Sequence, residues 1–111
     1  MILEKVVKKE NIYKEYLRLV NGITKLTDKE LEIVDCLLKI NDLDDNILST
    51  ENRKKVQQEC KANELNLNNH ISNLKKKLII KEQEGILVLN DNIIPDYVNG
   101  DILVVYRLKI V

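Results

Sequence analysis

The sequence predicts an α+β domain in which several short helices precede an antiparallel β-hairpin. Apolar residues recur at helical spacing in several stretches between residues 11 and 78, and more than one stretch begins at a good helix-capping residue. After residue 78 the pattern changes to short β-rich runs separated by a turn that contains glycine. With 111 residues the chain is long enough for one hydrophobic core, so we expect a single domain over residues 1–111.

The N-terminal part, residues 1–25, is expected to hold a strand and a helix. β-Branched residues cluster in Met1–Lys8 and no clear capping residue precedes them, which favours a short strand there. Ile12, Tyr16, Leu19 and Val20 then follow helical spacing, so we predict a helix over residues 11–20 that ends at Asn21-Gly22.

The middle part, residues 26–89, begins with a capping box. Thr27 is the predicted N-cap and Glu30 the third helical residue of a helix over residues 28–40, which should be the most buried helix. The acidic loop that follows lacks the glycine and the ligand spacing of a calcium-binding loop, so no metal site is expected. Ser49 or Thr50 then caps a predicted helix over residues 51–61.

The most informative stretch is Asn66–Leu78, which has two opposed faces at helical spacing. We expect Asn66 to cap this helix and an apolar stripe to pack into the core. The stripe consists of Leu67, Ile71, Leu74 and Leu78. The opposite face is polar and then basic, and it carries Asn68, Asn69, Ser72, Asn73, Lys75 and Lys76. Because the apolar stripe is committed to packing, the polar face is the one free for function.

Two further strand regions are expected near the C-terminus. The runs on either side of Glu82–Gly85 predict a hairpin over residues 79–89 with a four-residue turn. In residues 90–111, a C-terminal extension, the alternation from Ile102 to Val111 predicts a strand. We expect that strand to pair with Met1–Lys8, since both would otherwise lack a partner.

Charge is distributed unevenly along this neutral chain. Residues 51–81 hold eight lysines and arginines against three acidic residues, a local charge of +5 within a net charge of zero. Such a segment is typical of a surface that meets phosphates, although a solvated lysine-rich face is the simpler alternative.

The order of elements over residues 26–89 resembles the winged helix-turn-helix domains of small bacterial and phage regulators. The Leu26-Thr27-Asp28-Lys29-Glu30 phrase is similar to the start of the opening helix in those families. The resemblance implies that helix 66–78 enters the major groove of double-stranded DNA and that hairpin 79–89 is the wing. It makes Asn68, Asn69, Ser72 and Asn73 candidates for base contacts, and Lys75, Lys76, Arg53, Lys54, Lys55 and Lys61 candidates for phosphate contacts.

The sequence departs from the family pattern at two places. Leu78 stands where a glycine often ends the recognition helix, and the predicted wing tip is acidic where a basic tip would suit phosphate. An alternative to DNA binding is therefore a protein-interaction or structural module, such as a component of a phage particle or replication complex.

The leading expectation is a DNA-binding transcriptional regulator of a phage or mobile element, acting by occupancy and as a dimer or larger assembly. No enzyme or cofactor is expected, because the single histidine, His70, has no carboxylate or nucleophile at helical spacing. Cys36 and Cys60 are expected to be reduced core thiols. The longest apolar run has five residues, which predicts no membrane span and a location in the host cytoplasm or a virion.

Overall fold

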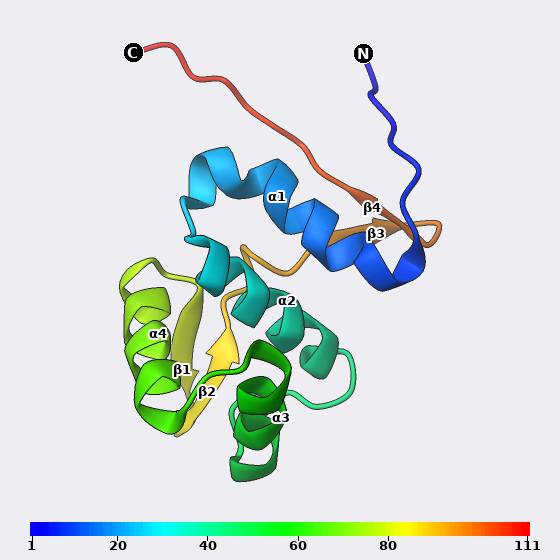
Figure 1. The fold of residues 1–111 in the computed structure, drawn as a ribbon. Coiled ribbons are helices and arrows are strands. Elements are labelled where there is room, and N and C mark those ends of the chain that lie inside the picture. The colour runs from blue at the N-terminus through cyan, green and yellow to red at the C-terminus, as the bar shows by residue number, and fades with distance from the viewer.

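A computed structural model describes residues 1–111 as four helices followed by two short antiparallel hairpins (Figure 1). A 3-10 turn, η1 (Lys9–Asn11), leads into α1 (Ile12–Thr24), α2 (Asp28–Asn41), α3 (Thr50–Cys60) and α4 (Glu64–Lys76). Strand β1 (Ile80–Gln83) pairs with β2 (Ile86–Leu89), and β3 (Asp96–Val98) pairs with β4 (Asp101–Leu103). The predicted α+β class is confirmed. None of the helices combines the length and the apolar content that crossing a membrane requires.

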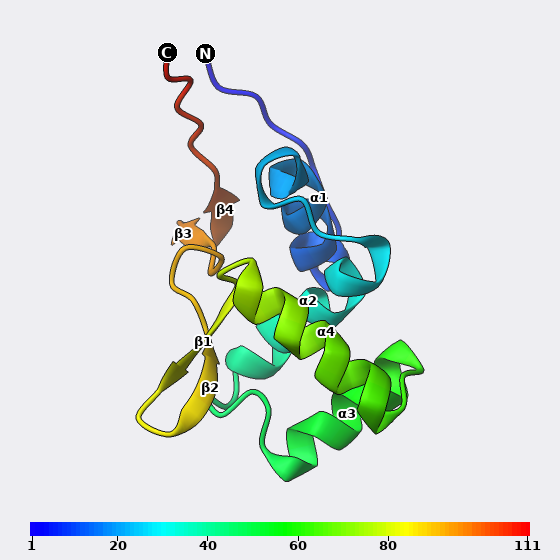
Figure 2. The same ribbon diagram turned by 90° about the vertical axis from the view of Figure 1, so that its left-hand side faces the viewer.

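Helix α2 lies at the centre of the fold, between α1 on one side and α3, α4 and hairpin β1–β2 on the other (Figures 1 and 2). A single cluster of 19 buried apolar residues joins all four helices and that hairpin. Ile33, Val34 and Leu37 of α2 are fully buried in this cluster. The expectation that this is the most buried helix is confirmed, because α2 has five buried residues and each of the other helices has three.

The capping residues of two helices are the predicted ones. Thr27 accepts a hydrogen bond from the Glu30 backbone N–H, and the Glu30 carboxylate accepts one from the Thr27 N–H, which completes the capping box of α2. Ser49 caps α3. The prediction for α4 was wrong, because Asn63 is its N-cap and accepts from the Asn66 N–H at 2.8 Å. The helix therefore begins at Glu64, two residues before Asn66.

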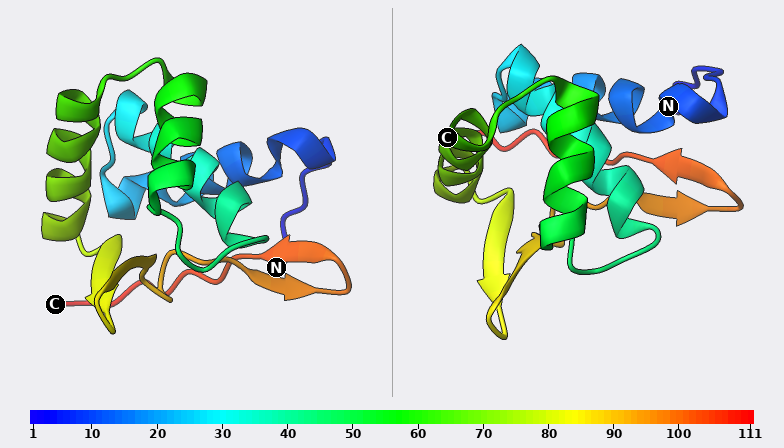
Figure 3. Two further views of the ribbon diagram at one scale, coloured as in Figure 1. Left: turned by 90° about the horizontal axis from the view of Figure 1, so that it is seen from below. Right: turned by 60° about the horizontal axis from the view of Figure 1, so that its bottom comes forward.

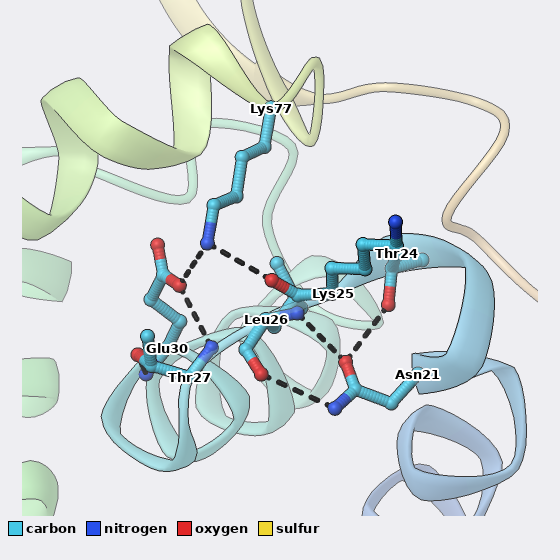
Figure 4. Close-up of polar contacts among 7 residues, drawn as sticks. All are labelled: Asn21, Thr24, Lys25, Leu26, Thr27, Glu30 and Lys77. Atoms are coloured by element: carbon cyan, nitrogen blue, oxygen red, sulfur yellow. Dashed lines mark hydrogen bonds and ion pairs between the residues drawn. The ribbon is translucent and has the colours of Figure 1, made fainter.

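Helix α1 does not end at Asn21-Gly22 as predicted but continues to Thr24. The chain turns at Lys25, which has the left-handed φ of 53°. The Asn21 side chain holds this turn, because its Oδ1 accepts from the Leu26 N–H at 2.8 Å and its Nδ2 donates to the Leu26 carbonyl at 3.1 Å (Figure 4). Asn21 therefore does not end α1. It lies within the helix and holds the connection to α2 through its side chain.

Both hairpins turn through two residues with positive φ. Glu84 (52°) and Gly85 (82°) connect β1 to β2, so the turn is two residues shorter than predicted. Asn99 (52°) and Gly100 (86°) connect β3 to β4. Positive φ at both central residues is the geometry of a type I′ turn, in which Asn-Gly is strongly preferred. The second hairpin was not predicted, although this dipeptide signals it.

The predicted pairing of the two terminal segments was wrong. Residues 1–8 form no strand, and of residues 102–111 only Ile102 and Leu103 are in a strand. The partner of β4 is β3, because a two-residue turn closes that pairing at far smaller entropic cost than a contact between opposite ends of the chain. Residues 104–111 therefore continue as an extended tail without a paired strand.

Candidate nucleic-acid interface

Helix α4 places a polar face on the outside of the molecule. Leu67, Ile71 and Leu74 are buried against the core, so the opposite face of the helix is directed to solvent. All six predicted residues on that face are exposed, namely Asn68, Asn69, Ser72, Asn73, Lys75 and Lys76. Figure 3 shows α3 and α4 joined by a short turn, with hairpin β1–β2 following the end of α4.

Four of the exposed residues form a continuous row along α4. Asn69, Ser72, Asn73 and Lys76 stand at i, i+3, i+4 and i+7, a spacing that makes them neighbours on the helix surface. Their side chains are free of hydrogen bonds within the chain, whereas the neighbouring amide of Asn68 is engaged by Arg53. This row, residues 69, 72, 73 and 76, is called the amide row below.

Arg53 links α3 to the polar face of α4. Its Nη1 donates to Oδ1 of Asn68 at 2.8 Å. A bidentate asparagine–adenine pair needs that oxygen as acceptor. Asn68 therefore suits the role of orienting Arg53 better than that of reading a base, which leaves Asn69 and Asn73 as the unoccupied amides.

The predicted phosphate contacts are not all gathered on one surface. Lys75 and Lys76 end α4, Arg53 meets Asn68, and Lys61 lies exposed in the turn between α3 and α4 with a φ of 50°. Lys55 lies elsewhere, because it lines a groove of about 830 Å³ between α1, α2 and α3. Lys54 is exposed on α3. The cations around α4 are thus fewer than the sequence suggested.

Lys77 has a structural role that the sequence did not reveal. Its Nζ donates to Oε1 of Glu30 at 2.6 Å and to the Lys25 carbonyl at 3.0 Å (Figure 4). Glu30 is only 2 % exposed. Burial raises the pKa of its carboxyl, but the hydrogen bonds from Lys77 and Thr27 outweigh burial, so the pKa lies below its ordinary value. Lys77 is therefore occupied, while Lys75 and Lys76 are available to a ligand.

The end of α4 is closed by a non-glycine residue in a left-handed conformation. Leu78 has a φ of 62°, and the next residue, Ile79, donates its N–H to the Leu74 carbonyl at 2.9 Å. This turn directs the Leu78 side chain outward, where it is 66 % exposed. The prediction that Leu78 continues the buried stripe was wrong, because the helix ends before that residue.

The tip of hairpin β1–β2 is acidic. Glu82, Gln83 and Glu84 are exposed at the tip, and Lys81 at the base lies 4.0 Å from Asp91. No cation offsets the glutamates at the turn. The hairpin therefore presents negative charge beyond the end of the basic part of α4.

The two cysteines meet between α2 and α3. The Cys36 and Cys60 thiols are free, and both line the groove between α1, α2 and α3. The interaction with Cys60, together with burial, raises the pKa of Cys36, and the interaction with Cys36 lowers the pKa of Cys60. The separation of 24 positions in the sequence gave no sign of this contact. It lies on the α1–α2–α3 groove, away from the amide row.

Comparisons with profiles of protein families, with curated protein sequences and with solved structures returned no significant match.

Proposed function

We propose that this chain is a winged helix-turn-helix protein that binds double-stranded DNA, with α3 and α4 as the helix-turn-helix and hairpin β1–β2 as the wing. The order of these elements, the short turn between the helices and the outward polar face of α4 support this assignment. Helix α4 enters the major groove, and the protein acts by occupying its site, as a transcriptional regulator of a phage or mobile element would.

The observation that carries this proposal is the amide row. An asparagine with both its carbonyl and its amino group free can pair with N6 and N7 of adenine, and a serine hydroxyl can donate or accept at several base edges. Asn69, Ser72 and Asn73 offer these groups side by side on an exposed helix. The site that they prefer is expected to contain adenine at neighbouring positions.

The positive charges beside the amide row are placed to contact the DNA phosphates that flank the bases. Lys75 and Lys76 are exposed at the end of α4, where cations also interact favourably with the helix dipole, and Arg53 adds a third positive charge from α3. The acidic tip of β1–β2 would be repelled by the backbone. We therefore expect the complex to be centred on α4, with the wing tip held away from the DNA.

Chemical-shift mapping with a short double-stranded DNA of mixed sequence tests this placement. The backbone amides of residues 68–76 and the Arg53 side chain should shift in proportion to the DNA added, while Glu84 and Gly85 at the wing tip should not. Shifts confined to another surface, or none at low salt, would contradict the proposal.

The second candidate is a protein-interaction module of the same fold, such as a component of a phage particle or replication complex. The acidic wing tip favours it, because Glu82 and Glu84 form an exposed negative surface that a basic protein partner would complement. Loss of partner binding on reversal of these two charges, with no binding of DNA at low salt, would support this function over the first.

A further inference from the structure

The chain exposes more surface than a compact monomer of its mass. Its accessible surface is 8406 Å² at 12.9 kDa, whereas a compact monomer of that mass exposes about 6,300 Å². The radius of gyration, 14.5 Å, also exceeds the value of about 13 Å for a compact chain of this length. Roughly 2,100 Å² of surface is thus available beyond what a closed monomer shows.

Half of the 18 exposed large apolar side chains lie in the two tails, residues 1–8 and 104–111. Both tails extend beyond α1 on the same side of the molecule (Figures 1 and 2). Their apolar residues that are at least 80 % exposed are Met1, Ile2, Leu3, Val6, Val105, Leu108, Ile110 and Val111. The side chains of Leu19 and Ile23 on α1 are also exposed. Apolar side chains with such high exposure mark a candidate interaction surface.

Apolar residues alternate along the C-terminal tail, and only the first of them pack against the core. Ile102 and Val104 pack against the core, and the Tyr106 hydroxyl donates to the Leu19 carbonyl of α1 at 2.5 Å. In an extended chain every second residue faces the same way, so Leu108 and Ile110 continue this face. Leu108 and Ile110 are exposed, because no other part of the chain packs against them.

We propose that the tail of a second copy of this chain covers this surface. Antiparallel pairing about a two-fold axis near Tyr106 would place Leu108 of each copy opposite Val104 of its partner, and Ile110 opposite the partner's Ile102. Paired residues of antiparallel strands share a face, so all these side chains would form one apolar surface. That surface meets α1 of both copies.

The occupant is a second copy for three reasons. The alternating tail is complementary to itself in antiparallel register, as a two-fold interface requires. A groove of about 240 Å³ beside α1, lined by Tyr16, Val20, Ile23 and Val105 among others, lies next to the tail and can receive further apolar groups. Finally, the excess surface of two copies together is about 4,200 Å², which includes all four tails and is enough to supply the 2,000–5,000 Å² that obligate dimers bury. The net charge of zero adds no repulsion between copies.

Sedimentation equilibrium of the full chain tests this inference. The wild type should show twice the 12.9 kDa chain mass, and the double variant Leu108→Lys, Ile110→Lys should show the chain mass itself. The matched control is Leu43→Lys, Leu65→Lys, which adds the same charge at exposed leucines outside the tails and should remain a dimer. Both variants should keep the far-ultraviolet circular dichroism of the wild type.

A monomeric wild type at all concentrations would overturn the inference, as would a tail variant that remains a dimer. A mixture of isotope-labelled and unlabelled chains tests the register, because contacts between Ile110 methyls and the partner's Ile102 are expected. A dimer without those contacts would exclude this pairing. None of these results depends on DNA, so dimerisation and DNA binding can fail separately.

Discussion

The Lys77 ammonium at the end of α4 lies 2.6 Å from the Glu30 carboxylate in the first turn of α2. The same carboxylate oxygen accepts the Thr27 backbone N–H at 2.8 Å (Figure 4). One buried carboxylate therefore caps α2 and also attaches the end of α4 to it. This contact sets the direction in which the last turn of α4 presents its neighbouring lysines.

Replacing Lys77 should destabilise the fold, whereas replacing its neighbour should not. Lys77→Met leaves the buried Glu30 carboxylate without its charged donor, and the expected loss is roughly 1.5–3 kcal/mol in the free energy of unfolding. Lys76→Met, at an exposed position, should change it by less than about 0.5 kcal/mol. Urea denaturation measures both. Equal losses in the two variants would show that the ion pair contributes little.

Glu30 should make stability depend on acid pH. Because its pKa is lowered in the folded state, its contribution is present above the unfolded value of about 4.3 and is lost as the pH falls through the folded pKa. The wild type should therefore exceed Glu30→Gln in free energy of unfolding at neutral pH, and the difference should shrink in acid. Chemical denaturation at several pH values measures this difference in free energy of unfolding. A difference that stays constant through the acid range would contradict the assignment.

Leu78→Gly should stabilise the protein. A leucine at a φ of 62° carries a backbone cost of about 1–2 kcal/mol, which glycine avoids. The greater freedom of glycine in the unfolded chain offsets about 0.5–1 kcal/mol of this gain. The control is Leu65→Gly, at an exposed leucine in the first turn of α4, which should destabilise the protein by up to about 1 kcal/mol. The midpoint of thermal unfolding should thus rise in Leu78→Gly and fall in Leu65→Gly. A loss of stability in both variants would exclude strain at Leu78.

The amide row should determine sequence preference more than total affinity. Once a preferred DNA site has been selected, Asn73→Ala should lower the ratio of specific to non-specific affinity by about 5- to 150-fold, since a bidentate base contact is worth about 1–3 kcal/mol. Asn92→Ala, at an exposed asparagine outside α4, is the control and should leave the ratio unchanged. Competition binding measures it. An equal loss on all DNA sequences would assign Asn73 to the backbone instead.

The parts of the fold that sequence reasoning predicted are those that local chemistry determines. The Thr27–Glu30 capping box and the polar face of α4 each follow from side chains a few positions apart. An alternating pattern, by contrast, shows which face a strand would bury but not which segment pairs with it. That is why the terminal strands were paired wrongly. The Asn99-Gly100 hairpin is different, because its turn dipeptide is a local signal that was overlooked.

The candidate site also combines features that local sequence determines with contacts between distant segments that it does not reveal. Helical spacing alone placed the amide row and its exposure. Nothing local distinguishes Lys77 from Lys75 and Lys76, because its partner Glu30 lies 47 positions away in the sequence. The engagement of Asn68 by Arg53, from a different helix, was equally hidden. Contacts between distant segments therefore decide which of the polar residues stay free.

The most direct test of DNA binding by α4 is a salt titration of affinity for mixed double-stranded DNA. The logarithm of affinity should fall linearly with the logarithm of salt concentration, with a slope of about −0.9 per phosphate contacted. In Lys75→Glu, Lys76→Glu the slope should flatten by about two, while Lys9→Glu, Lys14→Glu, with the same change in charge outside α4, should retain the wild-type slope. Equal slopes in the two variants, or no binding by the wild type even at low salt, would contradict DNA recognition by this helix.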